Sequence, residues 1–274
     1  MWITPARIFY AGLLGAPSVR RLGAWTLYFT CDAPLRVARV NGNGGSEPWR
    51  DGELAIVPPY TGHRVESAGR RLPDVLIEPE SIDVDRLGEL LGSLLRAHGG
   101  VFDATHPMAA RLLDRLRDAH DTLASWSEPL RAVDADFDTL VFGAPLPVRA
   151  LDPRIARVLA LLEEPDASSL SGERLADEVH LSFSRFVHLF KEEVGVPLRT
   201  FRSWKRARSW LRYVTQDTNL TEIAHHTGYP DSAHFSRSIR QVFGLQPKDV
   251  MAGCRRLALH GDAQGTAGQA RKHR

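Results

Sequence analysis

Two segments near the C-terminus repeat each other at a fixed offset, and this repeat constrains the fold more than any other feature of the chain. A pair of bulky apolar residues followed by a glycine recurs 49 positions later, first as Phe186, Phe190 and Gly195 and then as Phe235, Ile239 and Gly244. Upstream, Leu175-Ala176 recurs as Ile223-Ala224 after 48 positions, so the second turn has one more residue than the first. A single helical period cannot keep this register across two separate elements. The repeat therefore predicts two helix-turn-helix units, each ending in a glycine cap.

Helix caps and apolar stripes place the elements around this repeat. Ser182 is expected to cap the second helix of the first unit, and Gly195 ends that helix. A long helix from residue 198 to about residue 215 joins the units, with apolar residues on one face and arginines on the other. Asp231 or Ser232 caps the second helix of the second unit.

Basic residues gather beside the repeat. The chain has a net charge of +2, but residues 1–150 sum to −3 and residues 151–274 to +5. One stretch has only Glu192 and Glu193 as acids and holds eight cations: Arg185, Lys191, Arg199, Arg202, Lys205, Arg206, Arg208 and Arg212. A charge run alone is usually a solvated face, but beside two helix-turn-helix units it indicates a surface for phosphates.

The first hundred residues have a different pattern. Short runs of β-branched and aromatic residues alternate with turn clusters, the runs being 25–30, 35–40 and 54–57 and the turns 41–46 and 58–59. Several short strands with frequent turns predict a small barrel or sandwich. Leucine stripes then predict two amphipathic helices, at 84–96 and 106–120, which either cover the strands or form a dimer seam. The proline-containing stretch 127–150 is interpreted as the connection between two domains.

Length and composition agree with a globular protein of two domains. The chain has 274 residues, of which 43% are hydrophobic and 25% are charged. No apolar run reaches about 18 residues and the N-terminus lacks the order of a signal peptide, so a cytoplasmic protein without a membrane segment is expected. Cys31 and Cys254 lie far apart and are interpreted as free thiols rather than a disulfide or part of a metal site.

The C-terminal motifs agree with a known family at many spaced positions. These are Leu175-Ala176, Leu181-Ser182, Phe190-Lys191, Gly195-Val196-Pro197, Leu220-Thr221-Glu222-Ile223-Ala224, Gly228-Tyr229, Ser232-Ala233-His234-Phe235-Ser236-Arg237, Phe243-Gly244 and Pro247. With these motifs, residues 150–252 resemble the DNA-binding domain of the AraC/XylS family of bacterial transcription regulators. Trp210 departs from the pattern, because the family usually has a small residue there, and Ile239 stands where phenylalanine is usual. The N-terminal half resembles the cupin-like sensor domains of the same family through residues 57–64 and 77–81.

The resemblance implies an α+β fold of two domains. Residues 1–126 are expected to form a cupin-like small β-barrel with trailing helices, which binds an effector or a second subunit. Residues 127–150 are the linker, and residues 151–256 are the all-α tandem helix-turn-helix domain. Residues 257–274 are expected to be a disordered basic tail.

Side chains near the start of the two recognition helices are the candidates for base contacts, because such a helix enters the major groove. They are Ser184, Arg185, Val187 and His188 in the first unit and Ser232, Ala233, Ser236 and Arg237 in the second. Arg185 and Arg237 can each form two hydrogen bonds with guanine, worth about 1 to 3 kcal/mol of discrimination. Val187 and Ala233 suit a thymine methyl group. For each position the alternative is an exposed residue without a DNA contact.

Phosphate contacts position such a domain without distinguishing sequences. Lys191, Arg206 and Arg240 are the candidates for them. Two recognition helices on one chain are expected in successive major-groove segments about 34 Å apart, with the joining helix setting that distance. Trp204 on the joining helix is interpreted as a core anchor rather than a base-stacking residue.

Four side chains of the first half are candidates for an effector pocket: Trp25, Tyr28, Tyr60 and His63. The favoured alternative is that they are ordinary barrel core. Neither a metal nor another cofactor is expected, because His63 is the only histidine before His98. His225-His226, with Glu222 and His234 nearby, form a poor chelating pair, since adjacent helical residues point about 100° apart.

These observations favour a sequence-specific DNA-binding transcription regulator that is not an enzyme. Its expected partners are double-stranded DNA and, from the resemblance, a small-molecule effector, a second copy of the chain and RNA polymerase. An activator is the expected kind of regulator, although the sequence leaves activation and repression open. The alternative is a DNA-targeted enzyme or a cupin-type enzyme with an appended DNA-binding domain. It requires an activated cysteine or several metal-binding histidines, and neither Cys31 nor Cys254 has a Pro-Cys-His-Arg-like setting.

Overall fold

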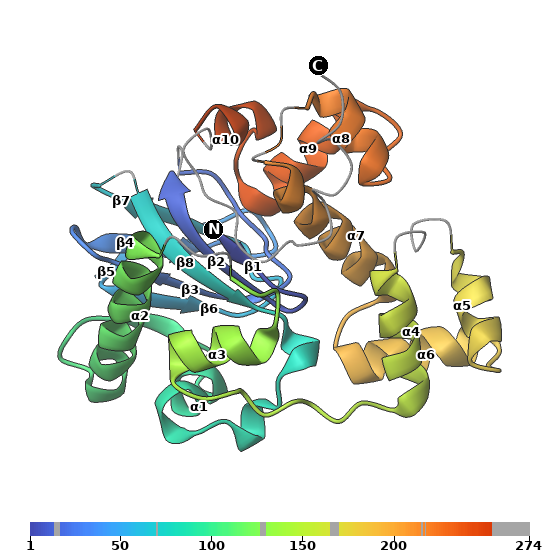
Figure 1. Ribbon diagram of the computed structural model, residues 1–274, viewed down its shortest axis with the longest axis horizontal. Helices are drawn as coiled ribbons and strands as arrows, with labels where there is room; N and C mark the ends of the chain where they lie inside the picture. Colours follow the sequence, from blue (N-terminus) through green and yellow to red (C-terminus); the bar gives the residue numbers. More distant parts are fainter. Residues whose placement is uncertain are drawn as a thin grey trace, which may run out of the picture.

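The computed structural model has an N-terminal part of two β-sheets with covering helices, followed by an all-helical C-terminal part (Figure 1). It describes residues 1–13, 17–69, 71–126, 130–164, 170–214, 216 and 218–253. This arrangement agrees with the expected two-domain α+β fold. The predicted tail at 257–274 and Cys254 lie outside the described residues. None of the described helices is both long and apolar enough to cross a membrane.

The strands form two antiparallel sheets. The larger sheet has the order β1 (Trp2–Ile3), β2 (Arg7–Leu13), β8 (Arg71–Ile77), β3 (Trp25–Phe29), β6 (Leu54–Val57) and β9 (Gly100–Phe102). The smaller sheet has the order β5 (Arg50–Gly52), β4 (Leu35–Arg39) and β7 (His63–Ser67).

The described strands form two separate sheets rather than the closed small β-barrel expected from the sequence. The sheets meet at one side, where the Glu53 N–H donates to the Phe102 carbonyl at 2.8 Å. Elsewhere, C-terminal helices help to cover the inner face of the larger sheet. One core combines residues of the sheets with residues of these helices, among them Ile8, Tyr28, Leu76, Trp204, Trp210 and Phe235. Closure into a barrel is therefore not needed to bury this face. The alternation of apolar residues in short strands does not distinguish the two arrangements.

Helices cover the opposite face of the larger sheet. They are α1 (Glu89–Arg96), α2 (Pro107–Ser125) and α3 (Asp134–Phe142), with the short 3₁₀ turns η1 (Pro79–Ser81) and η2 (Val84–Arg86) before them. Leu27 and Val75 of the sheet share a core with Leu112 and Leu116 of α2, and all four are fully buried. The predicted leucine stripes therefore cover the strands, which was one of the two interpretations.

The stretch 127–150, interpreted from its prolines as a connection, contains helix α3. Phe137 and Val141, four positions apart on this helix, are fully buried in the core of the N-terminal part. Arg7 of β2 forms a buried ion pair with Asp138 of α3, with 2.7 Å between Nε and Oδ1. A packed helix thus lies within this stretch, while the domain limits at residues 126 and 150 remain predictions.

The C-terminal part has the helices that the repeat predicts. They are α4 (Pro153–Glu163), α5 (Gly172–Glu178), α6 (Phe183–Val194), α7 (Leu198–Ser209), the 3₁₀ turn η4 (Trp210–Tyr213), α8 (Leu220–His226), α9 (Ser232–Phe243) and α10 (Pro247–Gly253). Helices α5 and α6 form the first helix-turn-helix unit, and α8 and α9 form the second. Ser182 caps α6 and Asp231 caps α9, each by accepting a hydrogen bond from the backbone N–H three residues later. Gly195 and Gly244 end the same helices with φ of 84° and 69°.

The joining helix ends earlier than predicted. Helix α7 stops at Ser209, and the chain continues as the 3₁₀ turn η4. Trp210, where the family usually has a small residue, is 1% exposed. Its ring centre lies 5.8 Å from that of Phe235 and 6.3 Å from that of Phe243, both in edge-on contact. The large side chain therefore packs against α9 in the core that this helix shares with the sheets.

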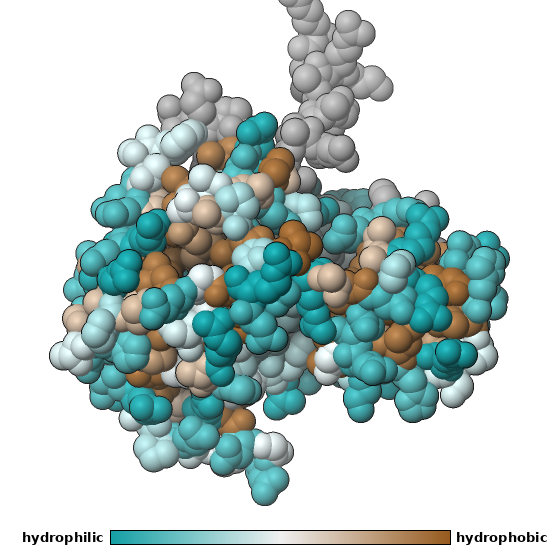
Figure 2. Space-filling model, turned by 90° about the horizontal axis from the view of Figure 1, so that it is seen from below, coloured by the Kyte–Doolittle hydropathy of each residue, from teal (hydrophilic) through white to brown (hydrophobic). Residues whose placement is uncertain are grey.

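The apolar cores of the two units differ. The first unit has a core of its own, in which Phe190 packs edge-on with both Phe186 and Phe201. The second unit shares its core with the β-sheets. Figure 1 shows α5 and α6 apart from the sheets and α10 next to them, and in Figure 2 the first unit forms a lobe beside the larger body of the molecule. Helix α7 spans the distance between the two units.

Candidate nucleic-acid interface

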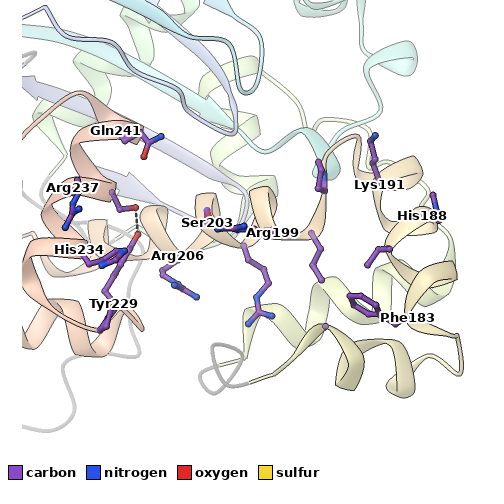
Figure 3. Close-up of a pocket in the computed structure, with 17 residues that line it drawn as sticks. Phe183, His188, Lys191, Arg199, Ser203, Arg206, Tyr229, His234, Arg237 and Gln241 are labelled. Atoms are coloured by element: carbon purple, nitrogen blue, oxygen red, sulfur yellow. Dashed lines mark hydrogen bonds between the residues drawn. The ribbon is translucent and has the colours of Figure 1, made fainter. Parts of the chain in front are cut away.

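A groove of about 980 Å³ runs between the two helix-turn-helix units along helix α7 (Figure 3). Helices α6 and α9 contribute side chains from opposite ends, and α7 contributes the residues between them. Both recognition helices of the predicted DNA-binding domain therefore face one continuous hollow.

The groove is strongly basic. Its cations are Lys191 from α6, Arg199, Arg202 and Arg206 from α7, and Arg237 from α9. None of the described residues that line it is acidic. A concave surface with one sign of charge focuses the electrostatic potential and attracts a polyanion such as the DNA backbone.

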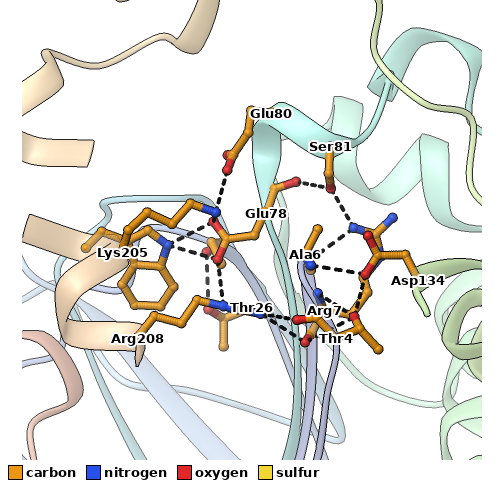
Figure 4. A network of polar contacts seen from close by, with 12 residues as sticks. Thr4, Ala6, Arg7, Thr26, Glu78, Glu80, Ser81, Asp134, Lys205 and Arg208 are labelled. Atoms are coloured by element: carbon orange, nitrogen blue, oxygen red, sulfur yellow. Dashed lines mark hydrogen bonds and ion pairs between the residues drawn. The ribbon is translucent and has the colours of Figure 1, made fainter. Parts of the chain in front are cut away.

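Helix α7 presents cations on two sides. Arg199 and Arg206 line the groove (Figure 3). Lys205 and Arg208 point to carboxylates of the N-terminal part (Figure 4). The sequence predicted one basic surface from the whole stretch 185–212. The structure removes Lys205 and Arg208 from that surface, because their charges are neutralised inside the protein.

Glu78 is the centre of this internal cluster. Its carboxylate accepts a hydrogen bond from the Trp204 indole N–H at 2.9 Å and lies 3.0 Å from Arg208 Nε and 3.3 Å from Lys205 Nζ. Arg208 also donates to the Thr4 carbonyl at 2.6 Å. Burial raises the pKa of Glu78, an effect that Lys205 and Arg208 oppose. The cluster fastens α7 to the larger sheet, and Trp204 is a buried anchor as predicted.

The structure places some of the predicted contact residues of the first unit in the groove. Val187, His188 and Lys191 line it from helix α6. Ser184 and Arg185 are exposed but lie outside the groove lining. DNA contacts by all five residues remain predictions.

In the second unit, the face of α9 that lines the groove differs from the predicted one. Arg237 lines the groove, together with His234, Ser238 and Gln241. The other predicted contact residues of this helix lie outside the lining: Ser232, Ala233, Ser236 and Arg240. The solvent-facing side of α9 is wider than the groove. The orientation of the two units, which α7 determines, decides which part of the exposed side of α9 lines the groove. No local sequence pattern contains that information.

Phe183 and Arg199 are among the groove residues that were not predicted as contacts. Phe183 is the first residue of helix α6, and 46% of its surface is exposed. Arg199 belongs to the basic stretch but was not selected from it. The signals were present in the sequence: an apolar residue directly after a helix cap, and an arginine on the polar face of the joining helix.

Arg206 is held in position by the second unit. Its guanidinium carbon lies 5.4 Å from the ring centre of Tyr229, and the Tyr229 hydroxyl is 2.8 Å from Ser238 Oγ. Burial raises the pKa of Tyr229, which keeps this hydroxyl protonated. The contacts place a cation in the groove between the two recognition helices (Figure 3).

The four residues predicted for an effector pocket do not share one cavity. Tyr28 lines an apolar cavity of about 60 Å³ between the larger sheet and the second unit, together with Trp210. Trp25 and Tyr60 line a separate open cleft of about 630 Å³ next to the end of α6. His63 accepts or donates a hydrogen bond with the Tyr28 hydroxyl at 2.9 Å, and burial lowers its pKa to about 4. Tyr28 and His63 are each 1% exposed, as the core alternative predicted.

Side chains of His, Cys, Asp and Glu can bind a metal ion, and a cysteine thiolate can act as a nucleophile. Among the described residues, no group of three or more His, Cys, Asp or Glu side chains is placed to hold a metal ion. The ring of His226 stacks on Tyr213, with 5.7 Å between the ring centres. Partial burial and then the charge of Asp32 raise the pKa of the Cys31 thiol, which disfavours the nucleophilic thiolate.

Comparisons with known proteins agree with this geometry. Residues 175–253 match a family of helix-turn-helix domains. The HTH-type transcriptional activator RhaS of Citrobacter koseri is 32% identical over 105 residues, which are 37% of this chain and 37% of RhaS. The invasion protein InvF of Salmonella typhimurium is 25% identical over 211 residues, which are 72% of this chain and 86% of InvF. These relatives support the resemblance of the C-terminal part to regulators of the AraC/XylS family. The chain spans only about a third of the length of the RhaS relatives, so the resemblance to them concerns the C-terminal domain.

Solved structures extend the likeness to the N-terminal part. ToxT from Vibrio cholerae, in a form bound to an unsaturated fatty acid, aligns with 93% of this chain and 98% of its own at a TM-score of 0.56. An apo form aligns with 92% of this chain at a TM-score of 0.55. The sequence identity in both alignments is 8%, so they concern the fold alone. The overall fold, with both its N-terminal and its C-terminal part, is therefore shared with ToxT.

Proposed function

We propose that the chain is a sequence-specific DNA-binding transcription regulator. The observation that carries this proposal is the groove between the two units, which has five cations and no acidic side chain among its described lining residues. The C-terminal domain is similar to that of RhaS, which is named as a transcriptional activator. Activation is therefore the proposed mode, and double-stranded DNA the proposed partner.

In the proposed complex, α6 and α9 enter successive segments of the major groove, and the DNA backbone between these segments crosses α7. Lys191 and Arg206 contact phosphates and position the domain. Val187, His188 and Arg237 contact base edges, with Arg237 donating to guanine. The other predicted contacts require the DNA to reach the outer sides of the two helices: Ser184, Arg185, Ser232, Ala233, Ser236 and Arg240.

The N-terminal part is proposed to regulate DNA binding through a small-molecule effector or a second copy of the chain. The second unit and the larger sheet together line the cavity beside Tyr28, so a change in this cavity is transmitted to α9 by direct contact. ToxT, which has the same fold, has been observed with a bound fatty acid. RNA polymerase is a further proposed partner. The proposed location is the cytoplasm, and no enzymatic activity is proposed.

Selection from random double-stranded DNA, followed by footprinting of the selected sites, tests this function. The full chain should enrich one sequence with two half-sites about one helical turn apart. The selection should be carried out at physiological salt, because non-specific attraction to phosphates is strong at low salt. Recovery of DNA without any enriched sequence would refute the proposal.

A further inference from the structure

Phe183 stands out among the exposed apolar side chains. Five large apolar residues within the described part of the chain are at least 36% exposed: Val19, Trp126, Val133, Val148 and Phe183. Of these, only Phe183 lines the basic groove. The phenylalanines of the first unit that build its core, Phe186 and Phe190, have no exposed surface. Phe183 is therefore not needed for that core and lies where the DNA is proposed to bind.

The ring of Phe183 lies against a glycine. A Cβ atom added at Gly172, the first residue of α5, would lie 2.7 Å from Phe183 Cε2. The ring therefore lies against the backbone at the start of α5, and a side chain at position 172 would displace it. Contact with α5 on one side restricts the positions open to the ring, which lowers the conformational entropy that it loses when it meets a ligand.

Phe183 and Val187 form an apolar pair on the groove side of α6. They are four positions apart, so their side chains are neighbours on one face of the helix. Helix α9 differs, because it lines the groove with His234, Arg237 and Gln241. The first unit thus presents an apolar pair beside His188 and Lys191, whereas the side chains of α9 in the groove all carry hydrogen-bonding groups.

In the major groove, the only apolar group on a base edge is the C5 methyl of thymine. The first residues of a recognition helix are the ones that reach base edges. We propose that Phe183 is a specificity-determining residue, which packs on a thymine methyl and, with Val187, makes the first half-site thymine-rich. This inference rests on the proposed DNA binding and specifies the base that the first unit recognises.

The test replaces thymine by uracil, which removes only the methyl group. The highest-affinity duplex from the selection is resynthesised with single thymine-to-uracil changes in each half-site, and affinity is measured with the full chain. At the base under Phe183, the change should weaken binding by the wild type about fourfold, the effect of one buried methyl group. Phe183→Ala should be insensitive to the same change, and Phe183→Leu should retain part of the sensitivity.

Two further variants distinguish a base contact from a non-specific loss of DNA binding. Gly172→Ala keeps the phenylalanine but displaces its ring, so it should reduce the sensitivity to uracil. Trp126→Ala removes an aromatic side chain of similar exposure, 42%, that does not line the groove, and should behave as the wild type. The inference is overturned if Phe183→Ala weakens all duplexes equally and keeps every uracil effect, because the ring then contacts the sugar-phosphate backbone. It is also overturned if a specific sequence is selected but no uracil change affects the wild type. If no sequence is selected at all, the proposed function fails first, and this inference with it.

Discussion

The two helix-turn-helix units have the same sequence pattern but different surroundings. In the first unit, neighbouring helices bury the repeated apolar residues, with Phe186 and Phe190 packed in the same core as residues of α4 and α7. In the second unit, Phe235 and Ile239 are buried in a core that includes Trp210 and residues of both β-sheets. A repeated motif fixes which face must be buried, but the adjacent part of the chain decides what buries it.

This difference assigns different roles to the two units. The second unit shares an apolar core with the N-terminal part. In addition, α7 is bound to the N-terminal part by the contacts of Lys205 and Arg208 with Glu78. The first unit has its own core and is carried at the other end of α7. We therefore expect a change in the N-terminal part to affect the second recognition helix directly, and the first only through α7.

The largest expected effect comes from Trp210→Ala. This variant removes a fully buried indole from the core that the second unit shares with the β-sheets. It should lower the free energy of unfolding by about 3 to 5 kcal/mol. Phe190→Ala is the matched variant in the first unit and should lower it by a similar amount. Hydrogen exchange distinguishes them, because only Trp210→Ala should speed exchange in β2 and β8. Equal exchange in these strands for both variants would show that the second unit is not specially coupled to the sheets.

The next effect comes from Glu78→Ala. It leaves Arg208 without its buried carboxylate partner and Lys205 with Glu80 alone, and should destabilise the protein by about 3 kcal/mol. The double variant Glu78→Leu and Arg208→Met keeps the ion pair between Lys205 and Glu80 and should recover most of this loss, because a buried ion pair contributes little net stability over apolar groups. Denaturant unfolding measures the stability of both variants. A double variant as unstable as Glu78→Ala would mean that the ion pair between Glu78 and Arg208 itself stabilises the contact between α7 and the sheet.

The pH dependence of stability tests the burial of His63, which lies in the smaller sheet on β7. His63 is the only histidine among the described residues that is fully buried, and burial lowers its pKa from 6.5 to about 4. Its stability contribution is therefore present above pH 6.5 and is lost as the pH falls through the folded pKa. Asp74, whose pKa burial raises to about 7, acts in the opposite direction, because its contribution is lost as the pH rises through that value.

The difference between the wild type and His63→Gln isolates the histidine. The stability advantage of the wild type should shrink by about 2 kcal/mol between pH 6.5 and about pH 5. Thermal unfolding at a series of pH values measures this. An advantage that stays constant over this range would mean that His63 is not held in its neutral form.

The smallest effect concerns the second recognition helix. Arg237 lines the groove and Arg240 does not, although both were predicted to contact DNA. Arg237→Ala should cost about 1 to 3 kcal/mol at one guanine and relax specificity there, whereas Arg240→Ala should weaken all sequences slightly. Affinity measured on a panel of single-base variants of the selected site separates the two patterns. Equal losses on every site from both variants would refute this division of roles.

Much of the C-terminal domain could be predicted because its signals are local. The cap at Ser182 and the left-handed glycines at 195 and 244 are fixed by contacts within a few residues, and helical spacing indicates which phenylalanines are buried. The two recognition helices and most cations of the groove therefore follow from the chain itself. The early end of α7 at Trp210 was missed because a tryptophan in helical spacing does not by itself indicate a 3₁₀ turn.

The sequence by itself determined the two helix-turn-helix units, their order and the basic helix between them, since these depend on spacing along one helix and on short-range capping. Only the tertiary structure decided that Lys205 and Arg208 serve the contact with Glu78 rather than DNA, that Phe183 faces the groove, and that the strands form two sheets. The reason is physical: which side of a helix or strand meets which neighbour depends on packing between residues far apart in the sequence, and no local period encodes it.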